Sequence, residues 1–431
     1  MILRDPVHGL VSFESAEAEI VEALLATAEL QRLRRIRQLG LTSLAYPGAD
    51  HTRFSHAIGT AHVMTCFVTR LRTLHDQLPY WQRLTTERAR DALAAALLHD
   101  LGHGPFSHLF EEALPRAPRH EEWTRRIVCS EGTEVNAVLR RYDSSLPDRV
   151  AALVAGKHEL PYLARAVSGA FDVDRCDYLL RDAHFTGVSY GHFDLDWLLR
   201  SLRLGVPLDG QHAPPLAIDG PKGLPAIESF TLSRLFMFQQ VYFHKASRSS
   251  EWMLSQILKR ASVLLLDGTK LGAAPAALTT LMRDGDASLG QYLELDDTAL
   301  WSALSAWREA SDPALADLAR RLHARRLFKT CELYGEQASP RGRLAAVEAA
   351  REEARQAGFD PELYVGLDVA TDTPFDDAGE SLAVIFPGGE QRSPADVSFV
   401  LGRLRGHEMQ RVRLLFPAEL RDRIIGALGS A

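Results

Sequence analysis

The sequence predicts a mainly α-helical protein with a small α+β appendage at its C-terminal end. Apolar residues recur at helical spacing through the first three quarters of the chain, and after about residue 325 short strand-like runs alternate with helical stretches. The 431 residues are 46% hydrophobic and 24% charged, which is ordinary for a globular protein with a large core. We therefore expect a helical body over residues 1–325 and a small α+β subdomain over residues 326–431.

Helical segments are marked by apolar periodicity and by capping residues. In TAELQRLRRIRQLG, apolar residues recur at helical spacing from Leu30 to Leu39, and Thr27 can cap the helix. The segment TTERARDALAAALLHD opens polar and turns apolar, so its C-terminal end should lie deep inside the protein. Further helices are expected over residues 56–74, 120–130, 134–141, 147–155, 194–203, 228–266, 313–325 and 341–357.

Strands are expected mainly in the last quarter of the chain. The runs RLFKTCELY, ELYVGLDVA, SLAVIFP and RVRLLFP are rich in the β-branched, aromatic and aliphatic residues that strands prefer. Upstream, LRLGVPLDGQHAPPLAIDG predicts a small hairpin around Gly210, made irregular by its prolines. The acidic stretch DTPFDDAGES is expected to be a solvated loop.

Composition and charge exclude several classes of protein. A formal charge of −7 argues against a general nucleic-acid binder. Cys66, Cys129, Cys176 and Cys331 are far apart and form no CxxC pair, which indicates reduced thiols and a cytoplasmic chain. The start MILRDPVHG is polar, so we expect no secretory signal, and no apolar run reaches the roughly 20 residues of a membrane helix.

The stretch LLHDLGHGPFSH places three histidines and an aspartate at the end of an apolar helix. His99 and Asp100 are adjacent and would point about 100° apart, so both can contact one object only if it lies near the helix end. A metal ion fits that position, because imidazole and carboxylate together suit Mn, Fe, Zn, Co or Ni, and suit Mg less well. Two ligands are too few, and His56 and Asp174 are the candidates for the others.

The alternative explanation is structural. A lone buried histidine is more often a hydrogen-bonded core residue than a ligand, and a His–Asp dipeptide is common by chance. The joint pattern is harder to attribute to chance. It combines the four candidate ligands with three further histidines, His103, His108 and His120.

The order H…HD…D, with HDLGHGPFSH around the dipeptide, resembles the HD-domain phosphohydrolases, and among them is most similar to the deoxynucleoside triphosphate triphosphohydrolases. The matching segments DPVHG, QRLRRIRQLG, YPGADHTRFSHAIGT, LLHDLGHGPFSH, DVDRCDYLLRDAHFTG and VYFHK span residues 5–245 in the family's order. The resemblance implies an HD-domain helical bundle and a homo-oligomer. It also implies one divalent metal ion (Mn, Fe, Zn, Co, Ni or Mg) held by His56, His99, Asp100 and Asp174.

The reaction implied by the resemblance is hydrolysis of a deoxynucleoside triphosphate to a deoxynucleoside and inorganic triphosphate. His120 is the expected general acid, with Glu121 as the carboxylate that orients it. His103 and His108 are expected to contact phosphate or to transfer a proton, although a structural bond to a backbone carbonyl would equally explain His108. Several negative charges require cations, and the expected ones are Arg53, Arg175, Arg234 and Lys245.

The resemblance also assigns residues to the sugar. Tyr178 is expected to pack where a 2′-hydroxyl would lie and so to exclude ribonucleotides, and Asp182 is expected to accept from the 3′-hydroxyl. Gln38, Leu39 and Tyr242 are expected to line the sugar and the nucleotide. The structural alternatives are a core aromatic for Tyr178 and solvated surface charges for the single arginines.

Some positions depart from the family's pattern. In a vertebrate member an activator nucleotide bridges subunits, but here no lysine precedes the DP, and Ala26 stands where an aspartate reads guanine. We therefore do not expect that guanine-activated switch. Phe238 stands where the family often carries a histidine, a change that can alter substrate specificity.

Two other functions stay open. The chain could be another HD enzyme, acting on a nucleoside monophosphate or a phosphodiester, although Arg53 and Lys245 favour a polyphosphate. It could instead be a nucleotide sensor that has lost turnover, against which the intact set of candidate ligands and His120 argue. The identity of the products separates these functions.

Overall fold

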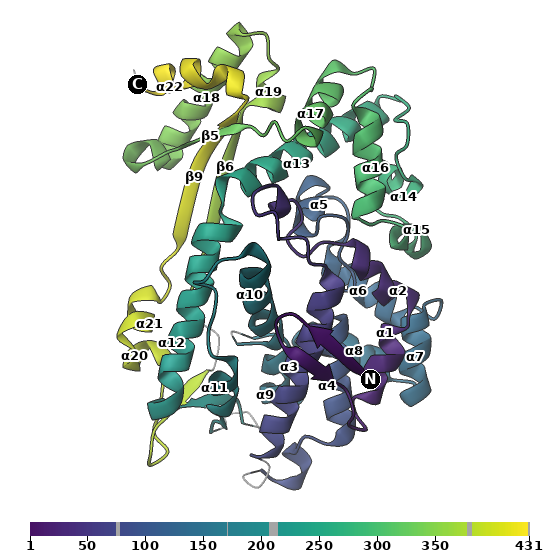
Figure 1. Ribbon diagram of the computed structural model, residues 1–431, viewed down its shortest axis with the longest axis vertical. Helices are drawn as coiled ribbons and strands as arrows, with labels where there is room; N and C mark the ends of the chain where they lie inside the picture. Colours follow the sequence, from purple (N-terminus) through teal and green to yellow (C-terminus); the bar gives the residue numbers. More distant parts are fainter. Residues whose placement is uncertain (75–77, 170, 207–213, 377–381, 430–431) are drawn as a thin grey trace.

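The computed structural model describes residues 1–74, 78–169, 171–206, 214–376 and 382–429. Figure 1 shows an elongated, mainly helical molecule, with a helical body below and a layer of helices and a small sheet above it. The expected fold class, a mainly α-helical protein with small sheets, is confirmed. Among the described helices, none combines the length and the apolarity that crossing a bilayer requires.

The centre of the body is formed by three helices, α3 (Arg53–Arg72), α4 (Thr86–Leu98) and α10 (Val173–Thr186). Helix α3 packs against both α4 and α10. Its small residues, such as Ala57 and Ala61, are fully buried, so the helices approach closely. The apolar half of α4, from Leu93 to Leu98, is at most 1% exposed, which confirms that this end lies deep inside the protein.

Shorter helices surround this centre. They are α1 (Glu19–Leu25), α2 (Ala28–Arg32), α6 (His120–Cys129), α7 (Glu134–Tyr142), α8 (Leu146–Val154), α9 (Pro161–Val167) and α11 (Leu195–Arg200). The helix expected from Thr27 is shorter than its periodicity suggested, because a 3-10 turn over Leu33–Arg35 ends it. A hairpin of β1 (Ile2–Asp5) and β2 (Gly9–Ser12), which the sequence analysis did not expect, closes the N-terminus.

The single helix expected over residues 228–266 is two helices. Helix α12 (Gly220–Met237) ends in a π-helical turn over Phe238–Tyr242, and α13 (Lys245–Leu266) begins after it. Such π-helical turns often occur at functional sites. Here the turn carries Phe238 and Tyr242, both of which face the cavity described below.

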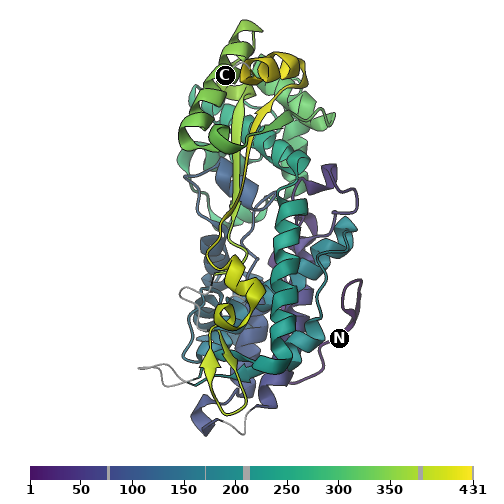
Figure 2. The ribbon, with the colours of Figure 1, turned by 90° about the vertical axis from the view of Figure 1, so that its left-hand side faces the viewer.

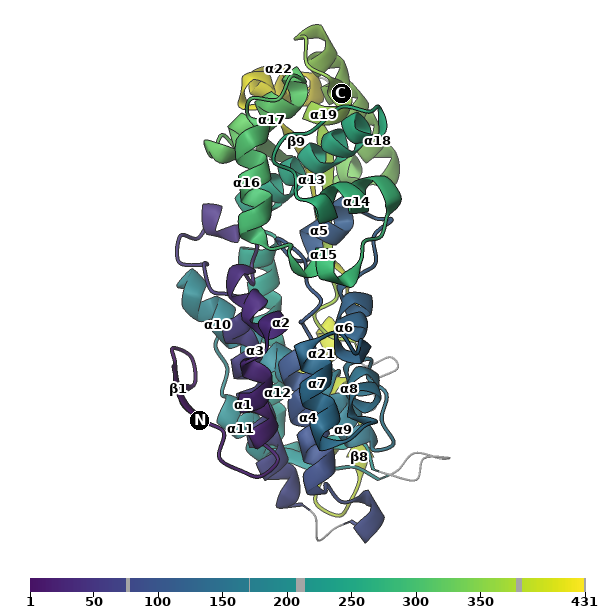
Figure 3. The same cartoon turned by 90° about the vertical axis from the view of Figure 1, so that its right-hand side faces the viewer.

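A second core joins α13 to helices above the body. They are α5 (His108–Ala113), α14 (Ala276–Asp284), α15 (Leu289–Leu293), α16 (Asp297–Trp307) and α17 (Pro313–His323). The buried residues of this core include Met253, Leu258, Trp307 and Leu318. Figure 3 shows this layer stacked over the body helices α1, α3, α4 and α7.

The C-terminal residues form a sheet of β5 (Lys329–Glu332), β9 (Met409–Phe416) and β6 (Gly366–Asp372), in that order and antiparallel. Helices α18 (Pro340–Gln356) and α22 (Arg421–Gly429) share the small core of this sheet, whereas Tyr364 of α19 (Pro361–Tyr364) belongs to the second core. The strands expected in the last quarter of the chain are present.

Part of the C-terminal chain returns to the body. Strands β7 (Ala383–Ile385) and β8 (Gln391–Arg392) extend the hairpin of β3 (Leu202–Leu204) and β4 (Leu216–Asp219), with β7 parallel to β4. Figure 2 shows this segment, with α20 (Pro394–Val397) and α21 (Phe399–Leu404), along the side of the body. The hairpin expected in LRLGVPLDGQHAPPLAIDG is therefore present, whereas Gly210 and residues 377–381 of the acidic stretch lie outside the described residues.

The crossing of α3 and α10 depends on a residue without a side chain. A Cβ atom at Gly59 would overlap the carboxylate of Asp177 and the guanidinium of Arg181. Overpacking of this kind typically costs about 1–3 kcal/mol. We expect Gly59→Ala to lower the free energy of unfolding by that amount, measured by denaturant unfolding. Gly290→Ala is the matched control, because a Cβ at Gly290 meets nothing within 4 Å, and equal stabilities would contradict the close crossing.

Candidate active site

Three of the four expected metal ligands bring one donor atom each to a common point. His56 lies in the first turns of α3, His99 caps the C-terminus of α4, and Asp174 is the second residue of α10. The Nε2 atom of His56 is 3.0 Å from Oδ1 of Asp174 and 3.3 Å from Nε2 of His99, which is 3.4 Å from the same oxygen. Donors about 2.1 Å from one ion would have such separations.

The two histidines are oriented for a ligand by their other ring nitrogens. Nδ1 of His56 is 2.7 Å from the carboxylate of Asp177, and Nδ1 of His99 donates to the backbone carbonyl of Ala96 at 2.9 Å. With the proton on Nδ1, each ring presents the Nε2 lone pair to the common point. The donor set therefore fits a divalent ion of the kind that binds nitrogen and oxygen.

Asp100 lies at the edge of this group and is shared between partners. Its carboxylate oxygens are 3.4 Å from Nε2 of His99 and 3.7 Å from Nε2 of His56. It also accepts from the guanidinium of Arg53 and lies 3.2 Å from Nε2 of His103. Burial raises the pKa of Asp100, but the adjacent Arg53 and histidines outweigh burial and hold the pKa well below its usual range. Asp100 is therefore an anion that links the candidate metal site to the histidines beyond it.

A buried carboxylate that the sequence analysis did not single out organises the site from behind. Asp177 is fully buried and accepts from Nε and Nη2 of Arg181 at 2.8 and 2.9 Å. It also lies 2.6 Å from Nε2 of His8, and Arg181 donates onward to Asp5 at 2.9 Å. The signal was present in DPVHG, whose Asp5 and His8 side chains both join this network.

The electrostatics of the group favour a positive charge at its centre. Burial alone lowers the pKa of His56, but the contacts with Asp174 and Asp177 outweigh burial and raise the pKa to about 10. Two carboxylates thus stabilise a cation beside His56. A divalent ion would supply that charge in place of the proton.

A second cluster contains the three other histidines and a glutamate. His103 and His120 stack with their ring centroids 3.9 Å apart and 13° between the planes, and His108 meets both rings edge-on. Donor atoms of these histidines and of Glu111 lie within 4.8 Å of one another. The lone pairs of two nearly parallel rings point in parallel planes and do not converge on one point. The arrangement therefore suits proton transfer between side chains better than binding of a shared metal ion. Burial, with the charge of Arg53, lowers the pKa of His103 and of His108.

The carboxylate closest to His120 is Glu111, not the expected Glu121. Oε1 of Glu111 lies 2.9 Å from Nδ1 of His120 and also accepts from its backbone N–H at 3.2 Å. Glu121 is 3.4 Å away, and its side chain is 62% exposed. Burial raises the pKa of Glu111, but its hydrogen bond with His120 outweighs burial and lowers the pKa. Sequence adjacency favoured Glu121, whereas the short helix α5 brings Glu111 to the ring.

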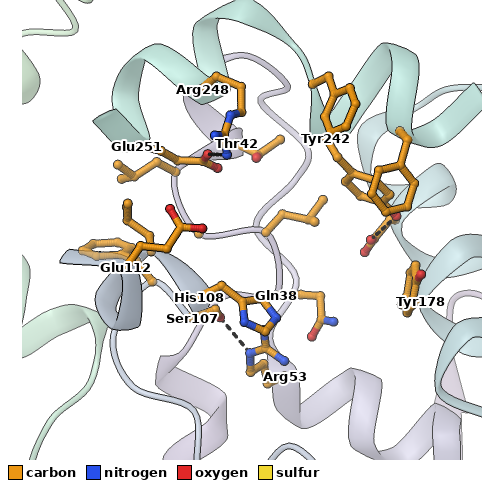
Figure 4. A pocket seen from close by; sticks show the side chains of 18 of the residues that line it. Gln38, Thr42, Arg53, Ser107, His108, Glu112, Tyr178, Tyr242, Arg248 and Glu251 are labelled. Carbon is orange, nitrogen blue, oxygen red and sulfur yellow. Dashed lines mark hydrogen bonds and ion pairs between the residues drawn. The ribbon is translucent and has the colours of Figure 1, made fainter. Parts of the chain in front are cut away.

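Two of the four candidate metal ligands, Asp100 and Asp174, line a cavity of about 390 Å³. Figure 4 shows Arg53, Gln38 and His108 at one end of it and Tyr178 and Tyr242 on one side. Leu39 and Asp182 also line it, as do Phe238 and Phe243. Of the histidines in the second cluster, only His108 is in this lining. His120, the expected general acid, lies behind it.

The turn that presents His108 has a strained backbone. Phe106 and Ser107 have φ values of 55° and 60°, a conformation that residues with side chains rarely adopt. Asp297 accepts from the backbone N–H of Phe106 at 2.8 Å, and Oγ of Ser107 accepts from Nε of Arg53 at 2.8 Å. These bonds hold the turn against the cavity.

Three of the expected sugar contacts, Tyr178, Asp182 and Tyr242, lie together on one wall. Asp182 is 2% exposed, with one carboxylate oxygen 2.8 Å from Nε2 of His51 and the other accepting from the hydroxyl of Tyr242 at 2.8 Å. Tyr178 lies beside Tyr242, with the ring centroids 6.3 Å apart. His51, which the sequence analysis did not identify, therefore fixes the carboxylate that faces the cavity.

Three of the four expected phosphate-binding cations are not in the lining of the cavity. Arg175 lies 2.7 Å from Asp172 within its own helix, and Arg234 binds Asp372 and two backbone carbonyls of the C-terminal segment. Lys245 is exposed at the start of α13. Arg53 does line the cavity, and so does Arg248, a cation that the sequence analysis missed one turn beyond Lys245.

The side chains of His56, His99 and Asp174 converge on one point, and His99 belongs to a His–Asp dipeptide at a helix end. This is the arrangement expected at the centre of an HD domain. The family description "HD domain" matches residues 53–182 of the chain. The chain belongs to the HD-domain phosphohydrolase superfamily, and within it resembles the deoxynucleoside triphosphate triphosphohydrolases.

Similar proteins extend this relationship over most of the chain. The uncharacterized protein YwfO of Bacillus subtilis is 34% identical over 97% of this chain and 92% of its own length. The deoxynucleoside triphosphate triphosphohydrolase SAMHD1 of Gallus gallus is 26% identical over 76% of this chain, which spans only 55% of that protein. A solved phosphohydrolase from Bacteroides thetaiotaomicron matches with a TM-score of 0.81 and 29% identity, over 96% of this chain and 99% of that one.

The role of Asp177 behind the metal ligands can be tested with Asp177→Asn. The substitution keeps the shape of the side chain but removes the charge that holds the Nδ1 proton of His56. Loss of such a partner typically weakens metal affinity roughly 10- to 100-fold. We expect that loss in a titration with Mn²⁺ or Zn²⁺, whereas Asp196→Asn on the exposed face of α11 should bind as the parent does. Unchanged affinity in folded Asp177→Asn protein would contradict the proposed support.

The assignment of Glu111 predicts an asymmetry between two neighbouring glutamates. Glu111→Gln should lower kcat roughly 10- to 100-fold with metal content unchanged, because a positioned acid–base group contributes factors of this order or larger. Glu121→Gln should stay within about twofold, because its side chain is mostly in solvent. Turnover of the proposed deoxynucleoside triphosphate substrate and metal analysis of both variants provide the check. The opposite order of effects would restore Glu121 as the orienting carboxylate.

Proposed function

We propose that this protein hydrolyses deoxynucleoside triphosphates, with a divalent metal ion, to a deoxynucleoside and inorganic triphosphate. The observation that carries the proposal is that two candidate metal ligands, Asp100 and Asp174, line a cavity whose wall also contains Tyr178, Asp182 and Tyr242. One cavity thus offers a place for a phosphate chain and a place for a sugar. Its volume of about 390 Å³ lies in the range of small-molecule sites.

The phosphate end combines one cation with a proton-handling cluster. A divalent ion bound by His56, His99, Asp174 and Asp100 would polarise the phosphate and lower the pKa of water. The guanidinium of Arg53 is held by Asp100 and Ser107, so it is oriented before a phosphate arrives.

Proton transfer to the departing 5′-oxygen is assigned to His108. Among the three clustered histidines, it is the one in the cavity lining. His120 lies behind it, with the ring centroids 5.1 Å apart, and is fixed by Glu111. His120 would then act through His108 rather than touch the substrate, so the role of general acid moves from the expected His120 to His108.

The sugar wall supports a deoxynucleotide. Asp182 faces the cavity with both oxygens already held by His51 and Tyr242, and each oxygen has a further lone pair for a 3′-hydroxyl. Tyr178 fills the adjacent space with an aromatic ring, and a 2′-hydroxyl there would have to displace it. Relatives whose name states the same reaction, SAMHD1 of Gallus gallus and of Homo sapiens, support this substrate class at 26% identity each.

Product analysis tests the proposal. The metal-loaded protein is incubated with each dNTP and the matching NTP, and the products are separated by ion-exchange chromatography. We expect inorganic triphosphate and deoxynucleoside from dNTPs, much slower reaction with NTPs, and no reaction with His99→Ala, which removes a metal ligand. Orthophosphate released from a nucleoside monophosphate, or cleavage of a phosphodiester without action on dNTPs, would replace the proposal with another HD reaction. Nucleotide binding without turnover under any divalent metal would make the protein a sensor.

A further inference from the structure

The end of the cavity away from the metal ligands carries charged side chains that the proposed reaction does not use. Figure 4 shows Glu112, Arg248 and Glu251 gathered there with Thr42, across the cavity from Arg53 and His108. Glu112 comes from α5, and Arg248 and Glu251 lie on neighbouring turns of α13. Three ionisable groups at one end of a substrate cavity require a reason.

Arg248 is fixed from outside the cavity by the C-terminal subdomain. Its Nε and Nη2 atoms donate to Oδ1 of Asp368 on β6 at 2.9 and 2.7 Å, and Nη1 donates to Glu251 at 3.0 Å. A guanidinium has five N–H groups, so these bonds leave two to face a ligand. Asp368 is 5% exposed, which makes the Arg248 position rigid.

The two glutamates differ in their surroundings. Burial, together with Glu112 and Asp368, raises the pKa of Glu251 to about 7 in spite of Arg248. Glu112 has no hydrogen bond or ion pair with any residue that the structure describes, and its carboxylate faces the cavity. Glu112 is therefore an uncommitted acceptor beside a donor, Arg248.

The charges at the two ends of the cavity favour one orientation of a bound nucleotide. Phosphates are attracted to Arg53 and to the divalent ion that the candidate ligands would bind. They are not attracted to the other end, where Glu112 is an acid and the group of Asp368, Arg248 and Glu251 has no net positive charge. An uncharged heterocycle with N–H donors has the opposite preference. A nucleotide whose phosphate is at the metal end thus has its base directed to the glutamates.

We propose that Glu112, Arg248 and Glu251 read the base of the substrate by its exocyclic amino group. A carboxylate accepts from the amino group, and Arg248 donates to the acceptor ring nitrogen beside it, a pattern that cytosine, adenine and guanine present and that uracil and hypoxanthine lack. Uracil and hypoxanthine lack the amino group, and uracil sets a carbonyl oxygen against the carboxylate. This inference rests on the proposed function for the orientation of the nucleotide.

Two nucleotide pairs that differ only around the amino group test it. Equilibrium binding is measured by calorimetry for analogues of dCTP against dUTP and of dGTP against dITP in which a methylene group replaces the 5′-oxygen, so that the bond broken in the proposed reaction is absent. We expect the amino-bearing member of each pair to bind about tenfold more tightly, the usual size of one hydrogen-bonded base contact. The same ratios are then measured as kcat/KM with the natural nucleotides.

Substitution should remove the discrimination. Glu112→Ala should bring both ratios to within about twofold of one. Glu251→Gln should shift them toward uracil and hypoxanthine, because the amide oxygen facing Arg248 leaves an amide N–H₂ for the base carbonyl. Glu294→Ala, at the exposed residue that caps the C-terminus of α15, is the control and should keep the parent ratios. Thermal unfolding verifies that every variant is folded.

The outcomes separate this inference from the proposed function. Parent ratios near one, or ratios retained in folded Glu112→Ala and Glu251→Gln, overturn the inference even if all dNTPs are hydrolysed. In the opposite case, the parent protein discriminates between the bases in binding, Glu112→Ala abolishes that discrimination, and no dNTP is hydrolysed. That result sustains the inference and overturns the proposed reaction.

Discussion

The site depends on one buried charge. The carboxylate of Asp177 has no contact with solvent, and an isolated carboxylate in such a place would be very costly, so its partners must all be present. Those partners come from the N-terminal hairpin through His8, from α3 through His56 and from α10 through Arg181. The same anion fixes which nitrogen of His56 faces the candidate metal site. Asp177 therefore both joins the N-terminal hairpin to α3 and α10 and orients a candidate metal ligand.

The cavity exists because regular structure is interrupted in two places. A continuous helix through residues 228–266 would not present Phe238 and Tyr242 as the π-helical turn does. A relaxed turn in HGPFSH would not have Phe106 and Ser107 in the left-handed region, where the chain turns His108 into the cavity. Both interruptions cost conformational energy, which buried bonds such as that from Phe106 to Asp297 offset.

The sequence predicted those parts of the site that local pattern and resemblance carry. His56, His99 and Asp174 lie in motifs at helix ends, and α4 is buried as its apolar half required. The partner of His120 was not predictable, because adjacency favours Glu121 while the chain reversal through α5 brings Glu111 closer. Arg234 and Arg175 illustrate the same limit: a cation in a motif can be paired within the fold, and only tertiary structure reveals its partner.

The C-terminal sheet of β5, β9 and β6 supports the cavity rather than standing apart from it. Strand β6 sends Asp368 to Arg248 on α13 and Asp372 to Arg234 on α12, so one strand holds the helices on both sides of the π-helical turn. Arg413 on the neighbouring strand β9 donates to the backbone carbonyl of Phe243, which lines the cavity. A displacement of this sheet would move the far end of the cavity while leaving the metal ligands, which lie on α3, α4 and α10, in place. The metal end and the far end of the cavity can therefore change independently, since different elements hold them.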